Sequence, residues 1–135
     1  GLAGMPAGMK SDFSGTCTND SAGPITIFGF SPHMHLLGVN MKSIVVRKAG
    51  GAPETVFDKP FLFDRQVNYM MNPQIVLQPG DKITSTCTFN NTTPANVAFG
   101  QSTKAEMCYQ FALAYPYNEL NNGVLSLIGA TNTCW

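Results

Sequence analysis

Histidine and charged side chains are scarce in this chain. Its 135 residues include two histidines, and only 12% are charged, with eight Lys and Arg side chains balancing eight Asp and Glu. Without a basic patch, nucleic acid is not an expected partner. Without a long apolar run, no membrane-spanning segment is expected. Any site that depends on imidazole chemistry must use one or both of the two histidines.

Paired metal-binding cysteines are also missing. The four cysteines stand at positions 17, 87, 108 and 134, and none forms a Cys-x-x-Cys pair, which argues against structural zinc. An even number of cysteines in a strand-rich chain instead predicts two disulfides in an oxidising compartment, secreted, periplasmic or vesicular. Three pairings are open, and the favoured one joins Cys87 to Cys108 and Cys17 to Cys134. Glycosylation triplets at 19–21, 90–92 and 91–93 add weakly to the prediction of a secreted glycoprotein.

No convincing helical period is present, and short strand-like segments alternate with turn residues. Residues 83–89 are the clearest strand, because apolar or small side chains alternate there with threonines. Further strands are expected at 13–18, 25–36, 41–48, 54–63, 74–77 and 105–115, with turns at 72–73 and 78–81. The segments 25–36 and 41–48 are expected to form a hairpin. This pattern predicts a single all-β domain over residues 13–135, an antiparallel, jelly-roll-like β-sandwich, preceded by a linker or tail at 1–12.

Both histidines lie in one short stretch, residues 31–38. In an extended strand, residues two apart point to the same face about 6.5–7 Å apart, so His33 and His35 could bind one metal ion. The opposite face is expected to carry the large apolar side chains of Phe28, Phe30, Met34 and Leu36. A bulge at Pro32 would upset this count. The alternative is that the two histidines are ordinary polar surface residues.

Met107 is a candidate third ligand. Two neutral imidazoles and a soft thioether suit copper, particularly Cu(I), better than calcium or magnesium. The alternative interpretation is that Met107 is a core residue, because this is the usual role of methionine.

Four segments in order resemble the copper type II, ascorbate-dependent monooxygenases, which include dopamine beta-monooxygenase and peptidylglycine alpha-hydroxylating monooxygenase. They are the His-x-His segment (33–38), Gln-Pro-Gly-Asp (78–81), Thr-Cys-Thr-Phe-Asn (86–90) and Glu-Met-Cys (106–108). The resemblance is to the second of two β-sandwich domains, each of which holds one copper. It implies that His33, His35 and Met107 bind the copper that activates dioxygen for C–H hydroxylation, with ascorbate as external reductant. It also implies the disulfides Cys87–Cys108 and Cys17–Cys134.

The other copper in this family is held by three histidines in the first domain, and this chain has only two. The resemblance therefore predicts a catalytic domain separated from an N-terminal electron-transfer domain, or a single-domain relative. The opening residues lack the features of a secretory leader, so we expect either a removed leader or a piece of a longer chain. Two other hypotheses are a non-catalytic copper-binding module for transport or storage, and a structural β-sandwich with an incidental His-x-His.

The resemblance also bears on the substrate. The peptide-hydroxylating member has an arginine two residues before the first histidine that helps hold a carboxylate, whereas this chain has Ser31. After Glu-Met-Cys, that member uses an asparagine, a tyrosine and a methionine at alternate positions, and here these are Tyr109, Phe111 and Leu113. Their face suits a small apolar or aromatic substrate. The alternative for all three is core packing, which is the favoured interpretation for Phe111 and Leu113. Alternation puts all three on the face of Met107, so either a pocket lies there or a bulge intervenes.

Overall fold

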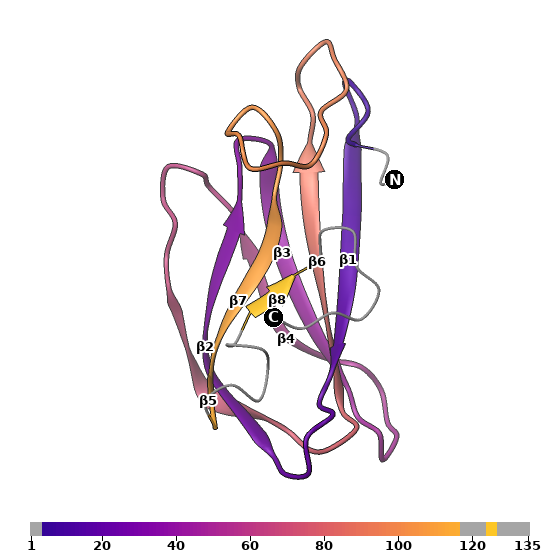
Figure 1. The fold of residues 1–135 in the computed structure, drawn as a ribbon, viewed down its shortest axis with the longest axis vertical. Coiled ribbons are helices and arrows are strands. Elements are labelled where there is room, and N and C mark those ends of the chain that lie inside the picture. The colour runs from indigo at the N-terminus through magenta and orange to yellow at the C-terminus, as the bar shows by residue number, and fades with distance from the viewer. Residues whose placement is uncertain (1–3, 117–123, 127–135) are drawn as a thin grey trace.

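A computed structural model describes residues 4–116 and 124–126 of the chain. The described part is built of antiparallel strands and contains no helix, as the turn-punctuated sequence predicts (Figure 1). The eight strands are β1 (Lys10–Thr18), β2 (Ile25–Met34), β3 (Gly38–Val46), β4 (Glu54–Pro60), β5 (Tyr69–Leu77), β6 (Lys82–Asn90), β7 (Cys108–Tyr115) and β8 (Val124–Ser126).

Two four-stranded sheets form the sandwich, one in the order β1-β6-β3-β4 and the other in the order β5-β2-β7-β8. Residues that face inward from both sheets make one buried core, with Phe30 and Met34 of β2 opposite Met41 of β3 and Phe89 of β6. The alternation predicted for residues 83–89 is confirmed, because Ile83, Ser85, Cys87 and Phe89 are fully buried and the intervening threonines are not.

The predicted disulfide between Cys87 and Cys108 is present, and it joins β6 of one sheet to β7 of the other. This bridge holds the first residue of β7 against the core. The other predicted bridge, Cys17–Cys134, depends on Cys134, which lies outside the described residues. Among those residues, no helix is long and apolar enough to cross a membrane.

The predicted hairpin of residues 25–36 with 41–48 is wrong. β2 pairs with β5 and β7, whereas β3 pairs with β4 and β6, so the turn at 35–38 carries the chain from one sheet to the other. Local sequence cannot distinguish these arrangements, because a tight turn can join neighbours in one sheet or cross between two packed sheets.

The predicted inward face of β2 is right for Phe30 and Met34 and wrong for Phe28 and Leu36. A register shift between Ile27 and Gly29, not at Pro32, takes Phe28 out of the core, and its ring lies 6.0 Å from that of Tyr115. Such a bulge exchanges the faces that a strict period of two would assign. Leu36 lies in the turn beyond the strand and is 61% exposed. Phe30 and Met34 are fully buried as expected.

Some predicted boundaries also differ. The tail predicted at 1–12 is partly integrated into the domain, because β1 begins at Lys10, and buried Met5 exchanges backbone hydrogen bonds with Val97. The turn expected at 72–73 lies within β5, where the pairing with β2 skips from Ile75 to Met70. The turn at 78–81 is confirmed by a hydrogen bond from the Asp81 amide to the Gln78 carbonyl.

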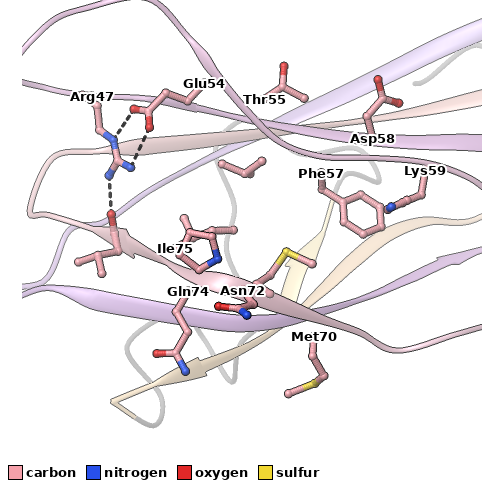
Figure 2. A pocket seen from close by; sticks show the side chains of 14 residues that line it. Arg47, Glu54, Thr55, Phe57, Asp58, Lys59, Met70, Asn72, Gln74 and Ile75 are labelled. Carbon is pink, nitrogen blue, oxygen red and sulfur yellow. Dashed lines mark hydrogen bonds and ion pairs between the residues drawn. The ribbon is translucent and has the colours of Figure 1, made fainter.

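A groove of about 640 Å³ runs between the edge strands β4 and β5, and neither histidine lines it (Figure 2). Arg47 lies at one end, where it pairs with Glu54 at 2.7 Å and also donates hydrogen bonds to the Val76 carbonyl and to Asp81. The guanidinium thereby ties one sheet to the other. No predicted ligand lines this groove, and we assign it no function.

Candidate metal centre

The two histidines lie side by side where β2 ends; this strand runs upward in Figure 1. Their ring centroids are 5.3 Å apart and the ring planes are nearly perpendicular, at 88°. His33 is partly exposed on the outer face of the sheet, whereas His35, just beyond the strand, is only 4% exposed. The spacing of two therefore brings two imidazoles together, as the sequence predicts.

Each imidazole is oriented through its Nδ1 atom. Nδ1 of His33 lies 3.0 Å from Oε1 of Gln66, and Nδ1 of His35 lies 3.1 Å from the carbonyl oxygen of Ala105. Because both partners are oxygen acceptors, Nδ1 carries the proton in the neutral ring and Nε2 keeps its lone pair. Nε2 has no hydrogen-bond partner in either ring within the described part of the chain. Both rings are thus prepared to bind a metal through Nε2.

Met107 comes directly before β7, next to the disulfide-bonded Cys108. β2 and β7 pair with Met34 opposite Cys108, so continuing this register by one residue puts Met107 opposite His35. The residue is partly buried. Within the described residues, no group of three His, Cys, Asp or Glu side chains could hold a metal ion. A third protein ligand beside the two histidines would therefore have to be a residue of another type. A thioether meets that need, and two imidazoles with a thioether form a soft donor set that fits copper.

A carboxylate to which sequence analysis assigned no role, Glu106, connects these elements. Glu106 is 1% exposed, and its two oxygens accept hydrogen bonds from the backbone amides of His35 and Leu37, each at 2.8 Å. The backbone amide of Met107 also donates to it. Burial raises the pKa of this carboxyl above its ordinary value, although the three amides and the nearby His35 act in the opposite direction. The signal in the sequence is the place of Glu106 in the Glu-Met-Cys segment (106–108), which carries part of the family resemblance but does not reveal what the carboxylate contacts.

The outer face of β7 continues from His33 as an aromatic surface. Tyr109 and Phe111 stack with centroids 5.5 Å apart, and the His33 ring lies 6.4 Å from the first and 6.1 Å from the second. Leu113 follows on the same face and is 37% exposed. The pairing with β2 is continuous from 108 to 113, so β7 has no bulge there. Core packing does not explain these three side chains, because Cys108, Gln110 and Ala112 are the ones that face inward.

The loop at 61–68, between β4 and β5, covers the histidines from the other side. Its Gln66 contacts His33, its Asn68 accepts a 2.7 Å hydrogen bond from the Ser31 hydroxyl, and the Phe63 ring lies 6.2 Å from that of His35. Sequence analysis missed this loop, since its contacts reach 33 to 37 residues back along the chain.

The fold is an antiparallel β-sandwich with a disulfide between its two sheets, and two imidazoles suited to binding a metal lie at one end. Fold and site together indicate a metal-binding β-sandwich domain. The comparisons agree. Residues 4–127 match the family described as "Copper type II ascorbate-dependent monooxygenase, C-terminal domain". The chain belongs to this family, which confirms the resemblance found in the sequence. The family uses copper and ascorbate, and its reaction is a monooxygenation.

Individual relatives agree with this assignment. DBH-like monooxygenase protein 1 of Homo sapiens is 31% identical over 94 residues, which are 68% of this chain and 15% of the relative. Dopamine beta-hydroxylase of Canis lupus familiaris is 30% identical over 108 residues, 77% of this chain and 17% of the relative. Tyramine beta-hydroxylase of Caenorhabditis briggsae is 27% identical over 97 residues, which are 71% of this chain and 17% of the relative. The chain thus spans less than a fifth of each of these relatives.

Proposed function

We propose that this chain is an oxygen-activating copper domain in which His33, His35 and Met107 hold one copper ion. The observation that carries the proposal is the pair of imidazoles, 5.3 Å apart, whose Nδ1 atoms are both held by oxygen acceptors. This arrangement leaves both Nε2 lone pairs for one metal, and family membership makes that metal copper. Copper, when bound, supplies the one-electron chemistry that activates dioxygen for C–H hydroxylation.

The remaining residues select and position the substrate. Tyr109, Phe111 and Leu113 extend from His33 as an apolar and aromatic surface, which suits a small aromatic or apolar molecule. Ser31 lies opposite Phe111 and offers no positive charge for a carboxylate, which argues against a glycine-extended peptide. Two relatives are named for hydroxylating dopamine and tyramine, both aromatic amines, and this agrees with an aromatic substrate.

Turnover needs electrons from outside this chain. Ascorbate is the proposed external reductant, and the electron-transfer copper, which in this family is held by three histidines, would come from an N-terminal domain. This chain cannot supply that site, because it has only two histidines. The disulfide between Cys87 and Cys108 favours a secreted or vesicular location, because such bonds persist in oxidising compartments.

The same shortage of histidine favours a second candidate function, a copper-binding module that carries or stores the ion without catalysis. Oxygen consumption with ascorbate, coupled to hydroxylation of an added aromatic amine, would exclude this alternative. Peroxide production alone would not, because accessible copper also reduces dioxygen.

The experiment that tests the copper site is X-ray absorption on the Cu(I)-loaded protein, with the variants His33→Ala and Met107→Ala. The expected wild-type spectrum contains two imidazole nitrogens and one sulfur, and the sulfur is lost in Met107→Ala. Met70→Ala is the matched control, since Met70 is a 65% exposed methionine in a neighbouring strand of the same sheet. The proposal is wrong if no copper binds, or if His33→Ala leaves the affinity unchanged.

A further inference from the structure

One carboxylate joins the two segments that carry the proposed ligands. Glu106 accepts from the backbone amides of His35 and Leu37 at 2.8 Å each, across 71 and 69 residues of sequence. It also accepts from the amide of the next residue, Met107.

The backbone of Glu106 is itself held on the side away from the histidines. Its amide donates to the Ala98 carbonyl and its carbonyl accepts from the Gly100 amide, both at 2.9 Å. On the near side, the carbonyl of Ala105 accepts from Nδ1 of His35 at 3.1 Å. Residues 105–107 are therefore attached at one edge to residues 98–100 and at the other to the turn that carries His35.

We propose that Glu106 is a positioning residue that sets Met107 relative to His35, so that the thioether and the imidazoles can reach the same ion. This inference rests on the copper site proposed above. The physical reason is that a carboxylate accepts through both oxygens, so it can hold amides from two segments at once. An amide in its place has only one acceptor and would direct an N–H group at a backbone N–H.

A purely structural role would also make Glu106 important for stability, so a matched control is needed. Asp81 provides it, because this carboxylate is 3% exposed and accepts from the backbone amides of Lys48 at 2.9 Å and Gln78 at 2.8 Å. Asp81 lies near the beginning of β2, where Ile25 pairs with Leu77, whereas the histidines lie at the other end of that strand. Asp81→Asn and Glu106→Gln therefore each remove a buried carboxylate that holds two backbone amides, at opposite ends of the domain. Asp81→Asn also removes the ion pair with Arg47, so its loss of stability should be at least as large.

Two measurements on the whole chain distinguish a positioning role of Glu106 from a purely structural one. In the metal-free protein, the ε-methyl resonance of Met107, assigned from Met107→Ala, should shift in Glu106→Gln and stay in place in Asp81→Asn. In the Cu(I)-loaded protein, Glu106→Gln should lose the sulfur contribution and bind copper about ten- to a hundredfold more weakly. Asp81→Asn should retain both properties, even though both variants unfold at lower urea concentration than the wild type.

The inference is overturned if Glu106→Gln keeps the wild-type methyl resonance, or if Asp81→Asn weakens copper binding to the same extent. If Glu106→Gln does not fold, Glu106→Asp replaces it, because Asp keeps both oxygens but withdraws them by one methylene. That variant should then shift the same resonance, and an unchanged resonance would refute the inference. A wild-type protein without a copper–sulfur contribution would instead refute the proposed site, while the metal-free measurement would still report on Glu106.

Discussion

Replacing Gln66 with leucine should weaken copper binding without disturbing the fold. Gln66 is exposed on the loop at 61–68, and its Oε1 atom lies 3.0 Å from Nδ1 of His33. Without this acceptor, Nδ1 of His33 has only water as a partner, and the proton is free to move to Nε2. A ring protonated at Nε2 cannot donate that lone pair to a metal.

The size of the effect follows from the exposure of the contact. Loss of an outer partner of a metal-bound histidine typically costs about 10–100-fold in affinity. Water can replace an exposed Gln66 in part, so the lower limit applies, about tenfold or about 1.4 kcal/mol. The unfolding free energy should change by less than about 0.5 kcal/mol, as for most surface substitutions.

The assay is anaerobic competition for Cu(I) against a chromophoric chelator, and Asn68→Leu is the matched control. Asn68 is an exposed residue of the same loop and contacts β2 at Ser31, two residues before His33, without touching a histidine. Long-range ¹H–¹⁵N spectra of the metal-free protein should report a tautomer change for His33 in Gln66→Leu only. Equal affinity of Gln66→Leu and wild type, or an equal loss in Asn68→Leu, would refute the reasoning.

Three other substitutions test contacts elsewhere in the sandwich. Burial acts to raise the pKa of Asp81, but hydrogen bonds from the Lys48 amide, Arg47 and the Gln78 amide outweigh it, so the pKa lies below its ordinary value. Asp81→Asn should therefore lower the free energy of unfolding by about 2–3 kcal/mol near pH 6. In urea unfolding, the difference between wild type and variant should shrink as the pH falls below about 4, because the wild type then loses the same contribution. A difference independent of pH would contradict this. Gly38→Ala would place a Cβ atom 2.6 Å from the Cβ of buried Met34. Thermal unfolding should therefore show a loss of stability of about 1–3 kcal/mol from overpacking. An unchanged unfolding midpoint would mean that the turn can shift freely. Gln110 is buried with no partner for Oε1, so Gln110→Met should leave the free energy of unfolding in urea unchanged or higher, unlike most core substitutions.

The site could be predicted from sequence only where short-range patterns control it. The spacing of two in His33 and His35 brings their rings together because neighbouring strand residues alternate between faces. The same alternation correctly puts Tyr109, Phe111 and Leu113 on one face of β7. The clear polar and apolar alternation of residues 83–89 likewise predicts which side of β6 is buried.

Other features depend on contacts that local patterns do not encode. The shift at Ile27 and Gly29 takes Phe28 out of the core, and the turn after His35 crosses to the second sheet. The acceptors of the histidine Nδ1 atoms, Gln66 and Ala105, lie 33 and 70 residues further along the chain.

By itself, therefore, the sequence determined the all-β class, the family and the pair of histidines that meets at one end of a strand. It favoured the Cys87–Cys108 disulfide among three possible pairings, and the structure contains this bond. Only the tertiary structure decided which strands are neighbours and that Glu106 lies between the His35 turn and Met107. The physical reason is the difference in sequence range between the two kinds of interaction. Alternation and turn chemistry act over a few residues, whereas the partner of a buried carboxylate is chosen by the packing of segments about 70 residues apart.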